Sequence, residues 1–351
     1  MLRPGIYELP ITRQLANQLD NLPDNRKATA AIDQAEASSV LSAYVAQVVR
    51  RALERMQDAH QELPEQLHLV NQLITLAGGV MDEDADGLSV DERAQQLLTL
   101  LAEQDPRLAL GKSAKDVQRP ETSLAQSSLF TGAVHEPQMF SELKKEIASA
   151  DSIDMLVSFI KWSGLRLIME ELTDFTQRGG QLRIITTSYM GATDIKAIEE
   201  LSKLPGVQIK VSYDTKRTRL HAKTYVFYRD TGFTTAYVGS SNLSNAAISS
   251  GLEWNVKVTK KDLPETIDKI AATFESYWNS NEFEYYSEDQ KERLARALNA
   301  EKYFGTNNAE VYTMDITPYS YQQEILDKLE KCADACEHVS ECVGSIVMKN
   351  T

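Results

Sequence analysis

Residues 219–227 of the chain read Arg-Leu-His-Ala-Lys-Thr-Tyr-Val-Phe, and residues 237–242 read Tyr-Val-Gly-Ser-Ser-Asn. The first stretch is rich in β-branched and aromatic residues, which predicts a strand that begins near Lys223. His221 and Lys223 are two positions apart, so on an extended chain their side chains point to the same face. This pairing suits an anion, because the imidazole can attack or donate a proton while the ammonium group neutralises negative charge.

The second stretch brings small polar residues to the end of another predicted strand. Gly239 allows a tight turn, after which the Ser240 hydroxyl, the Asn242 amide and backbone N–H groups form a cradle for an anion. Glu253 follows eleven residues after Asn242, in an otherwise apolar run that also predicts a strand. A carboxylate at this position can orient His221 and hold its protonation state.

Strand-like and helical patterns alternate from about residue 135 to residue 260. The predicted strands are 153–160, 182–187, 207–211, 223–227, 235–238 and 254–258, and the predicted helices between them are 165–175 and 195–204. This alternation is typical of an α/β sandwich with a largely buried sheet.

The flanking regions are predicted to be helical. Apolar residues recur with helical spacing over 40–56 and 67–76, and the second stripe is expected to stop at Gly78-Gly79. A capping-box match, Ser89-x-x-Glu92, predicts a third helix over 94–101. We therefore expect a helical domain at 1–111, a linker at 112–134, an α/β domain at 135–285 and a helical tail at 286–351.

Composition and charge limit the classes of partner. The 351 residues are 42% hydrophobic with a net charge of -14, which divides into -8 over 1–111, +2 over 112–259 and -8 over 260–351. A general basic coat for DNA is excluded, but the local run Lys216, Arg217 and Arg219 favours phosphate binding in the middle segment. Thr187 and Tyr189, at the end of a predicted strand, are further candidates for contacts with DNA.

No apolar stretch in the sequence is long enough to span a membrane, and the three cysteines all lie between Cys332 and Cys342. We expect a cytoplasmic protein without a disulfide framework. Cys332, Cys336, His338 and Cys342 match no common zinc module, so no metal and no cofactor is expected.

The middle of the chain resembles the phospholipase D superfamily, and most closely its nucleases with one H-x-K motif per chain. The resemblance rests on an ordered set of residues: His221, Lys223, Ser240, Asn242 and Glu253. It implies a mixed-sheet α/β sandwich with these five residues in the active site. The family usually has an aspartate five residues after the lysine, where this chain has Tyr228, and the nearest acid is Asp230.

The flanks resemble the start of DEAD/DEAH-type helicases that carry such a nuclease at their N-terminus. The segment Pro318-Tyr-Ser-Tyr-Gln322 is similar to the adenine-reading Q motif, with Gln322 as its glutamine. No Walker-type phosphate loop occurs in the sequence, so we expect no ATPase activity. We expect either a part of a longer protein that carries the motor, or a shortened relative that acts alone or with a separate motor. The resemblance implies a role in restriction or anti-phage defence.

These observations lead to one main hypothesis, a metal-independent DNA endonuclease. His221 is expected to form a phosphohistidine, while Lys223, Asn242 and Ser240 hold the non-bridging oxygens. A second histidine is needed to protonate the leaving oxygen, which predicts a homodimer with a shared site. Two alternatives remain: a lipid phosphodiesterase of the same superfamily, and a non-catalytic DNA-binding module of a defence complex.

Overall fold

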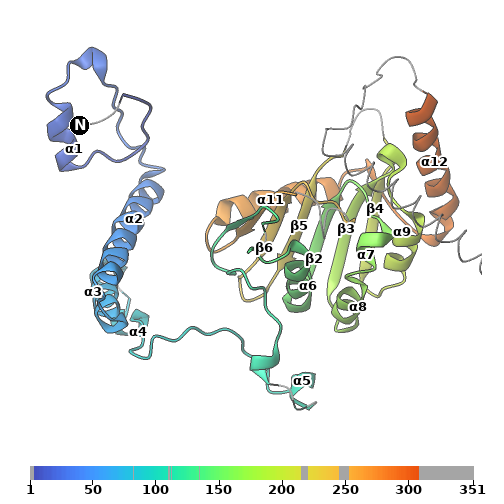
Figure 1. Cartoon of the computed structure of the whole chain (residues 1–351), viewed down its shortest axis with the longest axis horizontal. Coiled ribbons are helices and arrows are strands. Elements are labelled where there is room, and N and C mark those ends of the chain that lie inside the picture. The colour runs from blue at the N-terminus through green and yellow to red at the C-terminus, as the bar shows by residue number, and fades with distance from the viewer. Residues whose placement is uncertain are drawn as a thin grey trace, which may run out of the picture. The chain divides into compact units, whose positions relative to one another are not determined.

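The computed structural model describes residues 4–81, 83–109, 111, 113–133, 135–214, 220–244 and 253–307. The chain divides into two compact units, Met1–Ala109 and Leu110–Thr351. Figure 1 shows helices in the first unit and a sheet covered by helices in the second. No helix in the described part of the chain is long and apolar enough to cross a membrane.

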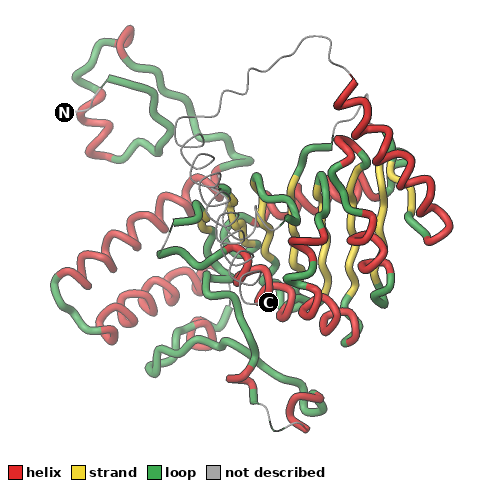
Figure 2. The backbone as a smooth tube through the Cα atoms, turned by 45° about the vertical axis from the view of Figure 1, so that its right-hand side comes forward, coloured by secondary structure: helices red, strands yellow, loops and turns green. Residues whose placement is uncertain are grey.

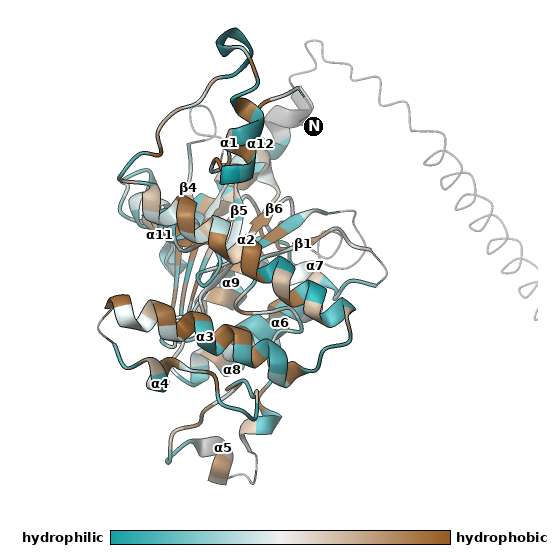
Figure 3. Ribbon diagram, turned by 90° about the vertical axis from the view of Figure 1, so that its left-hand side faces the viewer, coloured by the Kyte–Doolittle hydropathy of each residue, from teal (hydrophilic) through white to brown (hydrophobic). Residues whose placement is uncertain are grey.

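The first unit is helical, as predicted. Its elements are α1 (Arg13–Leu19), a 3-10 turn η1 (Asp24–Arg26), α2 (Ala37–Asp58), α3 (Leu63–Met81), α4 (Ala85–Leu88) and α5 (Pro106–Ala109). The amphipathic pattern of α2 and α3 appears as alternating apolar and polar bands in Figure 3. Gly78 is the only fully buried residue among those that the structure describes in this unit.

Two predicted helix boundaries in the first unit are wrong. Helix α3 does not stop at Gly78-Gly79 but continues to Met81. Gly78 serves instead to let α4 approach, since a Cβ there would lie 2.8 Å from the Ala85 Cβ. The predicted helix over 94–101 is absent. The Ser89 hydroxyl donates to the Ala85 carbonyl (2.9 Å), so Ser89 ends α4 instead of beginning a new helix.

The second unit contains an eight-stranded mixed sheet, which confirms the predicted fold class. Its strands are β1 (Ser128–Phe130), β2 (Ser152–Val157), β3 (Gln181–Thr187), β4 (Val207–Ser212), β5 (Lys223–Tyr228), β6 (Thr235–Gly239), β7 (Asn255–Thr259) and β8 (Phe283–Tyr285). The spatial order is β1-β7-β6-β5-β2-β3-β4-β8. Strands β2, β3 and β4 are parallel, and every other neighbouring pair is antiparallel.

Helices cover both faces of this sheet (Figure 2). One face packs against α6 (Met139–Ser149), α7 (Trp162–Leu165), α8 (Met169–Gln177), α9 (Ile195–Ser202) and α12 (Lys291–Asn307) and forms the largest apolar cluster. The other face packs against α11 (Pro264–Trp278), whose Ile267, Phe274 and Trp278 contact two smaller clusters. Short 3-10 turns η2 (Ala114–Asp116), η3 (Tyr189–Gly191) and η4 (Glu288–Gln290) complete the described elements.

The sheet domain is larger than the sequence predicts at both ends. Strand β1, within the expected linker 112–134, pairs with β7 at the sheet edge. The Glu142 carboxylate accepts hydrogen bonds from the backbone N–H groups of Glu121 and Thr122, at 2.7 and 3.1 Å. Beyond residue 285, Leu294 and Leu298 of α12 are buried in the main core. These contacts involve residues far apart in sequence, so no local pattern signals them.

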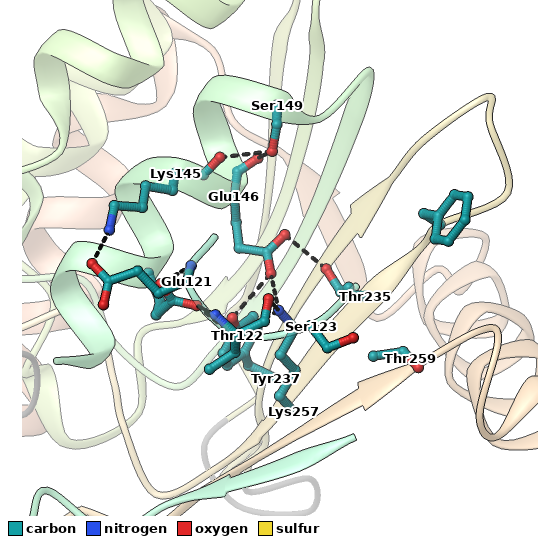
Figure 4. A network of polar contacts seen from close by, with 12 residues as sticks. Glu121, Thr122, Ser123, Lys145, Glu146, Ser149, Thr235, Tyr237, Lys257 and Thr259 are labelled. Carbon is teal, nitrogen blue, oxygen red and sulfur yellow. Dashed lines mark hydrogen bonds and ion pairs between the residues drawn. The ribbon is translucent and has the colours of Figure 1, made fainter. Parts of the chain in front are cut away.

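A buried ionic network joins α6 to β6, to β7 and to Arg229 just after β5; Figure 4 shows Glu146 with its partners on β6 and β7. The Glu146 carboxylate is fully buried, 2.6 Å from the Arg229 guanidinium and 2.9 Å from the Lys257 ammonium. It also accepts hydrogen bonds from the hydroxyls of Thr235 (2.8 Å) and Tyr237 (3.0 Å). Burial acts to raise the pKa of Glu146, but the two neighbouring cations outweigh it and hold that pKa below its ordinary value.

We predict that Glu146→Gln destabilises the second unit by about 3–5 kcal/mol, because two buried cations lose their counter-charge. Urea unfolding followed by tryptophan fluorescence measures this, since Trp162, Trp254 and Trp278 all belong to this unit. A carboxyl group with a lowered folded-state pKa contributes stability that is complete above about pH 4.3 and is lost as the pH falls. The difference between the two proteins should therefore shrink in acid.

The control for this prediction is Lys203→Ala, which removes a solvent-exposed ion pair with Glu200. Its unfolding midpoint should stay near that of the wild type, because an exposed pair leaves no buried charge behind. Equal effects of the two variants would show that the Glu146 network contributes no more to the free energy of unfolding than an exposed ion pair does.

Candidate functional site

The sheet topology brings the candidate residues together at one end of the strands. Strands β2, β3, β4 and β6 end there, and the antiparallel strands β5 and β7 begin there. His221 lies two residues before β5, Ser240 to Asn242 follow β6 directly, and Glu253 lies two residues before β7. Residues separated by up to 32 positions in the sequence are thus gathered at adjacent strand ends.

His221 and Lys223 are in contact. The Lys223 Nζ lies 3.0 Å from Nδ1 and 3.3 Å from Nε2 of His221, and it donates to the His221 carbonyl at 2.8 Å. The His221 side chain is exposed, whereas Lys223 is only 6% exposed. The next residue on this face, Tyr225, is in the main core, while Ala222 packs against the opposite cluster. The strand therefore holds a fixed ammonium group below an accessible imidazole.

Asn242 is held from the neighbouring loop. Its side chain is 6% exposed, and its Oδ1 accepts a hydrogen bond from the Phe159 backbone N–H at 3.2 Å. The next residue, Leu243, forms a bridge with Ile160 and accepts from the Lys161 N–H at 2.8 Å. With its oxygen turned to the loop after β2, the amide directs its NH₂ group, a hydrogen-bond donor, to the other side.

Three buried residues that the sequence analysis did not single out support this turn. The Tyr225 hydroxyl donates to the Ser241 carbonyl at 2.9 Å, and the Asn255 Nδ2 donates to the Ser241 hydroxyl at 2.7 Å. Burial raises the pKa of Tyr225, so its hydroxyl keeps its proton and remains a donor. The only signal in the sequence is the period of two, which places Tyr225 on the face of Lys223.

The Ser240 side chain lies at the end of β6, beside the segment that leads into β7. It is exposed, and its hydroxyl lies 3.2 Å from the backbone N–H of Trp254 and 3.4 Å from the Trp254 carbonyl. The backbone N–H of Ser240 also donates to that carbonyl at 3.1 Å. These contacts tie the end of β6 to the segment that leads into β7.

Glu253 lies before β7 and not within a strand, because pairing begins at Asn255. Among the described contacts, none is a hydrogen bond between Glu253 and His221. Its charge acts instead on Lys223: burial lowers the pKa of Lys223, and the nearby Glu253 carboxylate partly opposes that shift. The carboxylate thus favours the charged form of the lysine.

The expected contact of Thr187 with DNA does not fit its position. Thr187 is 1% exposed, and its hydroxyl donates to the Ser212 carbonyl at 3.2 Å and accepts from the Tyr189 N–H at 3.1 Å. It closes the end of β3, as polar residues at strand ends often do. Tyr189 lies in η3 and is partly exposed.

Several candidate residues lie outside the described part of the chain: Lys216, Arg217, Arg219, Gln322, Cys332, Cys336, His338 and Cys342. Within the described part, no three His, Cys, Asp or Glu side chains form a group that could hold a metal ion. Tyr228, where the family usually has aspartate, lies at the other end of β5 and pairs with Ser152, whereas Lys223 pairs with Val157.

Parts of the chain are similar to several solved structures. NucT from Helicobacter pylori is 22% identical, with 43% of this chain and 94% of that chain covered and a TM-score of 0.34. Nuc from Salmonella typhimurium, a phospholipase D family member, is 20% identical, with 46% and 99% covered and a TM-score of 0.34. Phosphatidylserine synthase from Haemophilus influenzae is 10% identical, with 52% and 44% covered and a TM-score of 0.36.

No curated protein matches the chain. Residues 143–278 match the family model described as "Cardiolipin synthase, PLD-like domain". This segment contains six of the eight strands, β2 to β7, and it includes His221, Lys223, Ser240, Asn242 and Glu253. The chain is therefore similar over residues 143–278 to a phospholipase D-like domain.

Proposed function

We propose that the chain is a DNA endonuclease that hydrolyses phosphodiester bonds through a phosphohistidine and without a metal ion. The observation that carries this proposal is the contact between the exposed His221 imidazole and the buried Lys223 ammonium group. An accessible nucleophile beside a fixed cation matches the needs of a phosphate diester.

In the first step, a ring nitrogen of His221 attacks phosphorus. A nitrogen–phosphorus bond forms, the bond to the leaving oxygen breaks, and that oxygen takes up a proton. Lys223 and the NH₂ group of Asn242 stabilise the negative charge that builds on the non-bridging oxygens. In the second step, water attacks phosphorus, an oxygen–phosphorus bond forms and the nitrogen–phosphorus bond breaks. The proton that the water loses passes to the group that protonated the leaving oxygen, and His221 is regenerated.

The proton for the leaving oxygen comes from a second copy of the chain. The sequence carries the H-x-K motif once, at His221 and Lys223, and two-fold symmetry supplies a second imidazole without a second motif. The proposed active form is therefore a homodimer that shares one site.

The biological role that we propose is restriction or anti-phage defence, together with a helicase motor in a longer form of the chain or in a separate protein. The support is the resemblance of the sequence around Gln322 to a helicase Q motif. Incubation with modified and unmodified plasmid DNA tests both activity and substrate choice. Nicked or linear products support the nuclease, and intact DNA under all conditions contradicts it.

A lipid phosphodiesterase is a second candidate, because the matching family model is described by the name cardiolipin synthase. Vesicles of phosphatidylglycerol, incubated beside plasmid DNA, separate the two activities. Release of glycerol or formation of cardiolipin, with plasmid left intact, would favour the lipid reaction.

We predict that plasmid cleavage in excess EDTA stays within about twofold of the rate with magnesium, because His221 and Lys223 supply the nucleophile and the positive charge themselves. Agarose gel assays of initial rates measure this. Loss of cleavage in EDTA that magnesium restores would contradict the mechanism.

We predict that His221→Ala lowers the cleavage rate by at least about 10⁴-fold, because the nucleophile is lost. Its melting temperature should stay near that of the wild type, since the side chain is exposed. When equal amounts of variant and wild type exchange subunits, only about a quarter of the dimers are wild-type homodimers. Activity should therefore fall to about a quarter of that of wild type at the same total protein concentration, because only these dimers cleave. A fall to one half would show that each chain works alone.

We predict that Glu253→Gln shifts the alkaline limit of activity to lower pH. Lys223 must be protonated to neutralise phosphate charge, and its activity is lost as the pH rises through its pKa. Burial already lowers that pKa, and removal of the Glu253 carboxylate lowers it further. The pH profile of kcat/KM measures the shift, with Glu200→Gln as a control outside the site. An unchanged profile would show that Glu253 does not act on Lys223.

A further inference from the structure

One face of the sheet carries apolar side chains that remain exposed next to the site. They are Leu129 on β1, Val238 on β6, Val256 on β7 and Trp254 just before β7, and their exposed fractions are 46%, 39%, 43% and 62%. We call these four side chains the edge patch. A sheet face that is open to solvent normally carries polar side chains, so a group of exposed apolar side chains there is unusual.

The edge patch is continuous across three neighbouring strands. The register pairs Leu129 with Val256 and Val256 with Val238, so their side chains form one row. Trp254 is two positions from Val256 and extends the row toward the strand ends. Lys257 points to the opposite face, where it contacts Glu146, so it places no charge in this row.

Helix α11 covers this face only in part. Its Ile267 packs with Val226, Ala236 and Val258, which lie further from the site along β5, β6 and β7. The C-terminal end of α11 contacts Leu156 and Ile185 on the other half of the sheet. The row of Leu129, Val256 and Val238 is left outside both clusters.

The edge patch borders the site directly. Trp254 is bonded through its backbone to Ser240, and Gly239 pairs with Asn255 in the sheet. Asn255 in turn supports the turn that carries Asn242, through Ser241. A partner seated on Trp254 and Val238 therefore lies beside the candidate catalytic residues.

We infer that the edge patch is the contact surface for a second copy of this chain and that it aligns the two halves of the shared site. This inference rests on the proposed function, in which each site is incomplete without a second His221. A row of aliphatic side chains without charge suits an identical apolar surface, whereas a DNA backbone requires cations.

The edge patch alone is too small to form a stable dimer interface. A stable dimer buries about 800 Å² on each partner, and four partly exposed side chains supply only part of that area. The remainder has to come from neighbouring surface, and the site edge with Ser240 and His221 adjoins the edge patch at Trp254. In an isologous contact that extends in this way, the strand ends that carry the two candidate sites lie next to each other.

The test is Val256→Lys in the full chain, measured by analytical ultracentrifugation and by plasmid cleavage. A lysine in the edge patch of each copy places two uncompensated charges in an apolar contact and should raise the dimer dissociation constant by at least about tenfold. Cleavage per chain should fall at low protein concentration and recover as the concentration rises. Trp254→Ala, which removes the largest contact, should act in the same direction.

Leu263→Lys is the matched control, because Leu263 is 45% exposed in the same unit and lies outside the edge patch. It should leave both dimer and activity unchanged, and melting curves of all variants check that each remains folded. A Val256→Lys protein that stays dimeric and active overturns the edge-patch inference but leaves the shared site intact. A wild type that cleaves as a monomer overturns both.

A third outcome distinguishes another use of the edge patch. If Trp254→Ala stays dimeric but binds single-stranded DNA more weakly, the indole stacks on a base and the edge patch is a nucleic-acid surface instead. This result also contradicts the inference.

Discussion

The pairing of Glu146 with Arg229 and Lys257 is the constraint on which the site depends. A buried carboxylate between two cations requires both partners, because removal of one leaves a charge without compensation. Arg229 follows β5 and Lys257 lies on β7, while the hydroxyl of Tyr237 on β6 bonds to the same carboxylate. A slip of one residue in any of these strands would turn a network member to the other face. The network thus fixes the register of the three strands whose opposite ends form the site.

The site combines one accessible group with several immobile ones. His221 is exposed, while Lys223 and Asn242 are almost fully buried. Their positions are set by hydrogen bonds to the backbone: Asn242 to Phe159, and the preceding turn to Tyr225. A site of this kind is preorganised, because its charge-stabilising groups need little rearrangement when a phosphate binds.

The two faces of the sheet have different roles. One face is filled by the main core and contains the ionic network, so its strands are fixed in place. The other face is covered by α11 over part of its area, and Val238, Val256 and Trp254 remain exposed beside the site. Exposed apolar side chains grouped on one face are a typical feature of a surface that binds another protein.

The alternation of strands and helices and the shared face of His221 and Lys223 could be predicted from the residues alone, because both follow from local periodicity. The folded chain was needed to show that β1 joins the sheet and that Thr187 is buried, because both depend on contacts between distant segments. The absence of a helix over 94–101 has a local origin, since Ser89 ends α4 and does not begin a new helix. The contacts of Asn242 and Glu253 could not be predicted from the sequence either, since they arise from the order of the strands and not from spacing along the chain.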